Sequence, residues 1–280
     1  MRELSVATIA THLEILINQA SFNLGERELC ALREAQARES SASGRAILSE
    51  LLQNADIARL EGRPLCQDTG VALVFLDIGQ DVHIVGGDLQ PAIYRAVRNA
   101  YQDNYLRKSM VEHPLARKNT GDNNPPIIHI RIVPGEQVRM RFAAKGGGCE
   151  NMSRIGMLTP SAGREGVMDF IVRTVCEAGG NPCPPVVVGV GLGGNFEKSA
   201  MLAKEALMRP LGDHAEREDD AEMERELLAR INAEGHGPMG LGGTTTALAV
   251  HVISHPCHIA SLPVAVNIDC HSHRHAEVIL

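Results

Sequence analysis

The first sixty residues carry apolar side chains at the three- and four-residue spacing of amphipathic helices. We therefore predict consecutive helices over residues 7–24, 26–39 and 43–60. Further helices are predicted over 89–111, 163–178, 196–208 and 213–233. Pro91 fits the first turn of its helix, where no intrahelical N–H is required. The 213–233 segment is strongly charged, which favours a solvated face over a binding site.

Other segments have the pattern of β-strands. Residues 71–78 are almost continuously apolar, which indicates a buried strand. Residues 127–133 and 137–143 alternate and are separated by Pro134, Gly135 and Glu136, which predicts a hairpin. Strands are also expected over 184–188, 245–253 and 262–268. Helices and strands mix without a regular βαβ repeat, so we predict an α+β fold. Its helical N-terminal part is followed by mixed β-sheets flanked by helices. No long linker interrupts the pattern, which favours one interlocked domain over residues 1–280.

Composition narrows the choice of partners. The chain has 280 residues, is 44% hydrophobic and carries a formal net charge of −7, so it can bury a sizeable core and lacks the basic character of nucleic-acid-binding proteins. An anionic substrate would have to meet local positive charge. The chain shows neither a secretory signal nor a run of ~18 apolar residues, and we expect a cytoplasmic protein that does not enter the membrane.

The seven cysteines are odd in number and form no Cys-x-x-Cys pair. In a cytoplasmic protein this pattern is a poor disulfide framework, and metal ligation by some of the thiols is the better interpretation. The cysteines are Cys30, Cys66, Cys149, Cys176, Cys183, Cys257 and Cys270.

Three polar segments could carry chemistry. Residues 66–70 (Cys-Gln-Asp-Thr-Gly) lie between a predicted helix and strand, where sites often lie, although for this segment alone a polar turn with a buried cysteine is the better explanation. Residues 117–126 form a loop rich in cations and amides, which suits either carboxylate binding or a capped turn. Residues 145–151 contain three consecutive glycines, which suits an anion-binding nest or a flexible turn.

Residues 189–194 (Gly-Val-Gly-Leu-Gly-Gly) satisfy the dinucleotide fingerprint after a predicted strand and before a predicted helix. The fingerprint also requires a second strand within a unit of ~30 residues. Here one helix leads into another, and no strand is expected before about residue 245. An NAD-dependent oxidoreductase is therefore a disfavoured alternative.

Several motifs together resemble the class I, iron–sulfur-dependent fumarate hydratase family, which includes the α subunit of L-tartrate dehydratase. The resemblance covers nearly the whole chain, and the ordered set is far more specific than any single motif. The motifs are residues 66–70, 119–123 (Asn-Thr-Gly-Asp-Asn), 145–148 (Lys-Gly-Gly-Gly), 183–185 (Cys-Pro-Pro), 237–243 (Gly-Pro-Met-Gly-Leu-Gly-Gly) and 262–267 (Leu-Pro-Val-Ala-Val-Asn), followed by Cys270 and His273-Arg274.

The resemblance implies a [4Fe–4S] cluster held by Cys66, Cys183 and Cys270. Clusters that only transfer electrons use four cysteines. Three ligands leave one iron open as a Lewis acid for the substrate carboxylate and the departing hydroxyl. Cys149 and Cys257 lie near the motifs and are the competing thiols.

The resemblance also assigns roles to other residues. Asp68 matches the proposed general acid. Arg107 competes with Arg117 for the role of carboxylate clamp, to which a guanidinium fork is suited, and Arg107 is preferred. The expected substrate-binding residues are Gln67, Arg107, Gly147 and His258.

Single-chain members of the family continue into a second domain that supplies further catalytic groups. This chain therefore resembles the α half of a two-subunit enzyme, expected to be inactive without a β subunit and to form a dimer of αβ units. The loop at 119–123 favours reversible hydration of fumarate to L-malate, whereas L-tartrate and mesaconate remain alternatives.

Two interpretations from other functional classes stay open. A cluster-binding redox protein would need a fourth protein ligand, for which Cys149 and Cys257 are candidates. A non-enzymatic scaffold is the other reading, but the presence of Asp68, Arg107 and all three motif cysteines argues against it.

Overall fold

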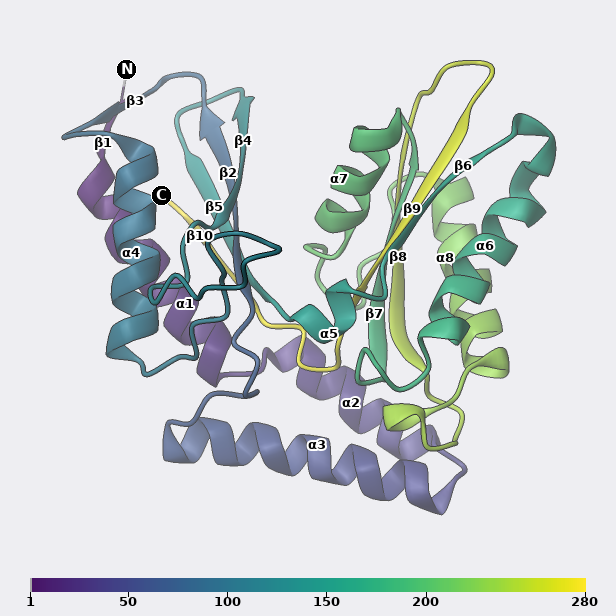
Figure 1. Cartoon of the computed structure of the whole chain (residues 1–280). Helices are drawn as coiled ribbons and strands as arrows, with labels where there is room; N and C mark the ends of the chain where they lie inside the picture. The colour runs from purple at the N-terminus through teal and green to yellow at the C-terminus, as the bar shows by residue number, and fades with distance from the viewer. Residues whose placement is uncertain (1) are drawn as a thin grey trace. The chain divides into compact units, whose positions relative to one another are not determined.

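The computed structural model describes residues 2–280, which form two compact units, each built from separate stretches of the chain. The first unit comprises residues through Gly25, Ala55–Gly147 and Arg274–Leu280, and the second comprises Glu26–Asn54 and Gly148–His273. Each contains a mixed four-stranded sheet with helices against it (Figure 1). The predicted α+β class is confirmed, and the single domain over 1–280 stays a prediction.

The sheet of the first unit has the order β10-β5-β2-β4. Its strands are β2 (Val71–Gly79), β4 (Ile127–Val133), β5 (Val138–Lys145) and β10 (His275–Ile279). Strand β2 is parallel to β4 and antiparallel to β5, and β10 is antiparallel to β5. A separate parallel pair joins β1 (Arg2–Ser5) to β3 (Val82–Val85).

The predicted hairpin between residues 127–133 and 137–143 is wrong. Both strands exist and a short connection joins them, but β2 lies between them and pairs with each. Strand β2 is buried along nearly all of its length, so the backbone groups on both of its edges must be satisfied within the sheet. The alternating pattern of β4 and β5 is compatible with pairing to each other or to β2. The need to pair both edges of the buried strand β2 decides the arrangement.

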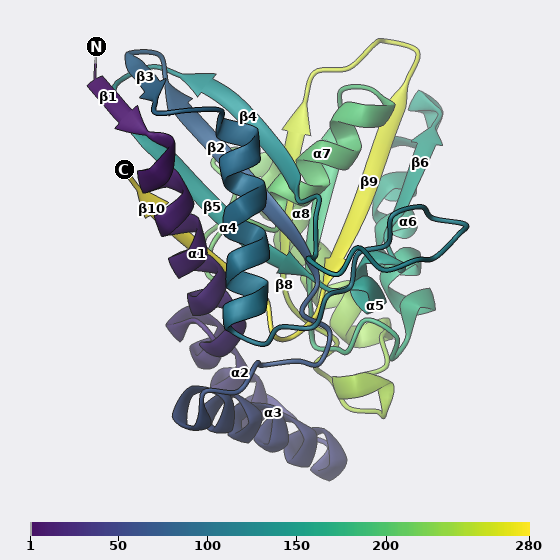
Figure 2. The ribbon, with the colours of Figure 1, turned by 60° about the vertical axis from the view of Figure 1, so that its left-hand side comes forward.

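Helices α1 (Val6–Phe22) and α4 (Leu89–Asp103) lie side by side against this sheet (Figure 2). Ser5 caps α1 by accepting a hydrogen bond from the Thr8 N–H at 3.0 Å. Helix α4 ends eight residues before the predicted residue 111. The Asn104 side chain donates to the Ala100 carbonyl, and Tyr105 adopts a φ of +54°, which closes the helix. The shared core includes Leu13, Ile17, Ile93, Tyr101 and Phe142.

The sheet of the second unit has the order β6-β9-β7-β8. Its strands are β6 (Arg154–Leu158), β7 (Val186–Gly193), β8 (Ala247–His255) and β9 (Leu262–Asp269). Strand β7 is parallel to β8 and antiparallel to β9. Helices α6 (Gly163–Ala178) and α8 (Glu218–Glu234) pack on one face and α7 (Phe196–Ala206) on the other (Figure 1). Helix α8 begins five residues later than predicted, because Glu224 of this helix binds the Ala215 N–H and holds the preceding residues in a turn.

The glycine repeat at 189–194 serves helix packing. A Cβ atom on Gly189 would lie 2.2 Å from the Ala203 carbonyl oxygen, and one on Gly191 would lie 2.0 Å from the Ser199 carbonyl oxygen. Only glycine lets α7 approach β7 this closely. The fingerprint pattern is therefore explained without a nucleotide.

The remaining helices are α2 (Glu26–Arg38), α3 (Ala42–Glu61) and the single turn α5 (Gly147–Glu150). The first two agree with the predicted segments, and the boundary between the units falls within α3. Glu39, between them, is 2% exposed and accepts hydrogen bonds from the N–H groups of Ser41, Thr244 and Thr245. Among residues 2–280, each helix is too short or too polar to span a bilayer.

Candidate functional site

The segment 66–70 connects α3 to β2 in the first unit. Its start is fixed by the Leu65 N–H, which donates to the Ser21 carbonyl at 2.9 Å. Cys66 is half-buried, and its Sγ lies 3.1 Å from Oε1 of the exposed Gln67. The structure therefore presents the thiol and the amide predicted for the site next to one another on the surface of this unit.

Asp68 is held by three hydrogen bonds. Its Oδ1 accepts the Gly70 N–H at 3.0 Å, and its Oδ2 accepts the Gly147 N–H at 2.7 Å. Its main-chain carbonyl accepts from Nη1 of Arg274 at 2.5 Å. Two residues predicted for the site, Asp68 and Gly147, are thus in direct contact although they lie far apart in the sequence. The carboxylate is aimed at the glycine-rich turn.

The residues after Asp68 tie three loops together. Tyr101 is fully buried, and its hydroxyl donates to the Thr69 carbonyl at 2.8 Å; burial raises the pKa of this phenol above its usual value. The buried Asn123 side chain donates to the Gly70 carbonyl at 3.1 Å and accepts the Ser109 N–H at 2.7 Å. The amide of Asn123 therefore braces the loop 107–109 against the start of β2.

The two arginines proposed as carboxylate clamp lie on this same loop system. Arg107 is exposed, and its main-chain carbonyl accepts a short hydrogen bond from the Thr69 hydroxyl. Arg117 is also exposed and has a φ of +59° in a turn closed by its N–H and the His113 carbonyl. The Arg107 backbone is thus attached to the residue that follows Asp68. The choice of Arg107 over Arg117 for the clamp stays a prediction.

Cys183 and Cys270 lie on adjacent loops of the second unit. Cys183 precedes β7 and has a φ of +56°, and Cys270 follows β9. The carbonyl of Cys183 lies 2.9 Å from Nδ1 of His271, and the carbonyl of Cys270 accepts the His273 N–H at 3.1 Å. Because β7 and β9 pair with Val187 opposite Asp269, the sheet register brings the two loops together. Both thiols are half-buried, and thiolate is the donor that iron–sulfur clusters require.

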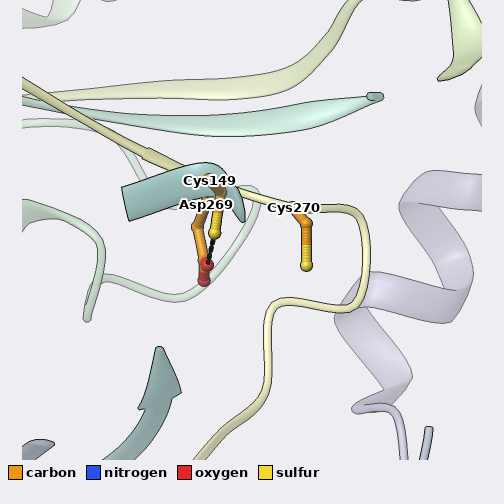
Figure 3. Close-up of side chains that lie close together, drawn as sticks. All are labelled: Cys149, Asp269 and Cys270. Atoms are coloured by element: carbon orange, nitrogen blue, oxygen red, sulfur yellow. Dashed lines mark hydrogen bonds between the residues drawn. The ribbon is translucent and has the colours of Figure 1, made fainter. Parts of the chain in front are cut away.

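A second set of donors surrounds Cys270. Cys149, Asp269 and Cys270 each direct one ligand atom into a space where all three atoms lie within 4.8 Å of one another (Figure 3). Sγ of Cys149 is 3.5 Å from Oδ1 of Asp269, and Nδ1 of His273 is 3.0 Å from the other carboxylate oxygen. These residues are able to hold a metal ion. Asp269 has no individual role among the residues predicted from the sequence. The sequence feature that points to it is the dense polar run from 269 to 275.

His258 lies in the exposed connection between β8 and β9. Its Nδ1 accepts the Ala260 N–H at 3.1 Å, and its carbonyl accepts the Ser261 N–H at 2.9 Å. The described contacts of His258 are thus those of a local turn, and its substrate-binding role stays a prediction. Cys257, beside it, is exposed and places Sγ 3.3 Å from the Ser261 carbonyl.

Comparison with known proteins shows which family this chain is similar to. Residues 10–279 match the family described as fumarate hydratase (Fumerase). A putative L(+)-tartrate dehydratase subunit alpha of Methanocaldococcus jannaschii is 41% identical over 269 residues, which is 93% of each chain. The L(+)-tartrate dehydratase subunit alpha of Escherichia coli (strain K12) is 32% identical over 252 residues, which is 89% of this chain and 83% of that one.

The class of enzyme that these findings define is a hydro-lyase. The chain belongs to the fumarate hydratase (Fumerase) family.

Proposed function

We propose that this chain is the α subunit of a two-subunit iron–sulfur hydro-lyase acting on a small dicarboxylate. The observation that carries the proposal is the held carboxylate of Asp68, next to Cys66 and in contact with Gly147. The family is iron–sulfur-dependent. The names of the relatives, each a subunit alpha, support a β subunit as partner. A dimer of αβ units stays a prediction.

The residues proposed to hold a [4Fe–4S] cluster are Cys66, Cys183 and Cys270. Their support is the family resemblance, the half-buried thiols, and the adjacent loops that carry Cys183 and Cys270. When bound, the cluster supplies a Lewis-acidic iron that polarises the substrate and improves hydroxide as a leaving group.

Proton transfer is assigned to Oδ2 of Asp68. In the chain alone this oxygen accepts the Gly147 N–H. A substrate carboxylate that took over the Gly147 N–H would release Oδ2 to hold a proton. Asp68 then delivers this proton to the departing hydroxyl in dehydration and recovers it in hydration. Binding and proton transfer are thus coupled through one backbone N–H.

Substrate orientation is assigned to Gln67 and Arg107, both exposed on this unit. Arg107 provides a guanidinium fork for the second carboxylate, and Gln67 provides an amide. His258 is proposed as a further substrate contact, and the family resemblance is its only support.

Two substrates are proposed. Reversible hydration of fumarate to L-malate is favoured by the Asn-Thr-Gly-Asp-Asn loop. Dehydration of L-tartrate is favoured by the names of the relatives. Asn123 of the loop is fully buried and braces backbone, so this residue supports the shape of the site and does not itself select a substrate. Mesaconate is the remaining alternative.

The test uses the chain together with its β subunit, reconstituted anaerobically with iron and sulfide. Hydration of fumarate and mesaconate and dehydration of L-tartrate are measured on one preparation. After one-electron reduction of the cluster with dithionite, we expect an electron paramagnetic resonance signal that requires Cys66, Cys183 and Cys270 and shifts on addition of the preferred substrate. A cluster whose signal changes with none of the three dicarboxylates would refute the lyase proposal and favour a redox protein.

A further inference from the structure

The three donors Cys149, Asp269 and Cys270 have a geometry that suits a single metal ion (Figure 3). They come from α5, from the end of β9 and from the residue that follows it. Cys149 and Asp269 are each 3% exposed, and Cys270 is half-buried. The group is therefore a largely buried set of two thiols and one carboxylate, of which Cys270 is the most exposed member.

The separation between Cys149 and Asp269 matches a shared ligand sphere. A tetrahedral zinc ion with Zn–S of about 2.3 Å and Zn–O of about 2.1 Å separates its sulfur and oxygen ligands by about 3.6 Å. Sγ of Cys149 and Oδ1 of Asp269 are 3.5 Å apart. Two sulfur ligands of such an ion are about 3.8 Å apart, and Sγ of Cys270 lies within 4.8 Å of both other donors. A side-chain adjustment of about 1 Å completes the site.

The carboxylate is already oriented for this role. Nδ1 of His273 lies 3.0 Å from Oδ2 of Asp269, and both side chains are buried. Carboxylates that bind metal ions are commonly held by such a hydrogen bond on the oxygen that faces away from the ion. The contact turns Oδ1 of Asp269 toward Cys149, so the donor set is arranged before any ion arrives.

We propose that Cys149, Asp269 and Cys270 form a mononuclear site for Zn²⁺ when the iron–sulfur cluster is absent. Two thiolates and one carboxylate suit a borderline-soft ion in tetrahedral geometry, and a solvent molecule takes the fourth position. Zinc displaces the thiol protons, which are released to solvent. The site shares Cys270 with the proposed cluster, so an ion bound here withholds that thiolate from cluster assembly.

The experiment uses the whole chain, freed of metal with a chelator, reduced and kept anaerobic. Co²⁺ serves as the spectroscopic probe for Zn²⁺. We expect one equivalent of Co²⁺ to bind with tetrahedral d–d bands and a charge-transfer band from two thiolates, and Zn²⁺ to displace it. Zinc-edge X-ray absorption should then show two sulfur neighbours at about 2.3 Å and lighter ligands at about 2.0 Å.

Variants decide which thiols bind. Cys149→Ser should remove about half of the charge-transfer intensity and weaken Co²⁺ binding at least tenfold, whereas Asp269→Asn should keep the intensity and weaken binding. Cys66→Ser, at a proposed cluster ligand outside the group, is the matched control and should change neither. Circular dichroism checks the fold of each variant, and Cys149→Ala replaces Cys149→Ser if the latter misfolds. The proposal is overturned if Cys149→Ser binds like the parent chain, or if Cys66→Ser loses as much intensity as Cys149→Ser. Neither outcome depends on hydro-lyase activity, so the proposed function is tested separately.

Discussion

Gly70 offers a sharp test of how the Asp68 segment is held. Its φ is +76°, and a Cβ atom added there would lie 2.8 Å from the main-chain carbonyl carbon of Ala144 and from the main-chain nitrogen of Lys145. The neighbouring strand β5 is paired to β2 at this point, so its backbone cannot retreat without loss of sheet hydrogen bonds. The substitution Gly70→Ala therefore introduces two separate penalties.

The left-handed backbone costs a non-glycine residue about 1–2 kcal/mol. The forced contact with β5 adds about 1–3 kcal/mol, the usual range for overpacking a tight site. We expect Gly70→Ala to lower the free energy of unfolding by about 2–5 kcal/mol. Gly62→Ala is the matched control, because Gly62 has a φ of +63° and no atom within 4 Å of the added Cβ. This control should cost only the first penalty.

Urea unfolding followed by circular dichroism measures both variants against the parent chain, with the slope against urea checked for equality. Alanine restricts the unfolded chain equally at both positions, so this contribution cancels in the difference. The difference should be about 1–3 kcal/mol and belongs to the contact with β5. If Gly70→Ala is no more destabilising than Gly62→Ala, the close approach of β5 to this segment is wrong.

Three further outcomes are expected. Asp68→Asn should lower kcat of the αβ enzyme by about 10²–10⁴-fold in steady-state assays, because the amide cannot transfer the proton, whereas Asp103→Asn at the exposed end of α4 should not; equal effects would refute the role. Burial alone would raise the pKa of Glu39, but hydrogen bonds from three backbone N–H groups, including that of Thr244, lower it. The ionised carboxylate therefore stabilises the folded protein at pH values above the unfolded pKa of Glu39, near 4.5. Urea unfolding at a series of pH values should show that this stabilisation is lost as the pH falls through the lower pKa of the folded state. The variant Glu39→Gln should not show this loss. Burial lowers the pKa of His251 to about 3. The free energy of unfolding should therefore fall below about pH 6.5, by up to about 1.4 kcal/mol per pH unit. A His251→Gln variant whose stability has the same slope against pH would contradict this.

Local pattern predicted the local structure of this chain. The helices over the first sixty residues and the buried strand β2 follow from side-chain periodicity, which reports which face of an element is covered. The partner of a strand is not encoded in its own alternation, so the pattern predicts a hairpin where β2 in fact lies between the two strands. The end of α4 depends on one asparagine and one left-handed tyrosine, which periodicity does not detect.

Some residues of the candidate site can likewise be predicted from the sequence, and others cannot. The motifs of Asp68 and Gly147 resemble those of a known family and so predict both residues for the site, although the two lie 79 residues apart in the sequence. Asp269 received no role, because its significance comes from Cys149, 120 residues away. Composition and spacing cannot find such a pair, since only the register of β7 and β9 and the position of α5 bring the donors together.

The order of the strands has a consequence for synthesis on the ribosome. The first unit takes its fourth strand, β10, from residues that follow the whole of the second unit in the chain, and Arg274 just before β10 binds the Asp68 carbonyl. Until those residues emerge, β5 has an open edge and the Asp68 loop lacks this contact. Folding therefore cannot proceed from the N-terminus in finished blocks, as it does in many proteins of separate domains. The nascent chain must carry an incomplete first sheet while the second is made, which leaves an unpaired strand edge available for chaperones or for aggregation.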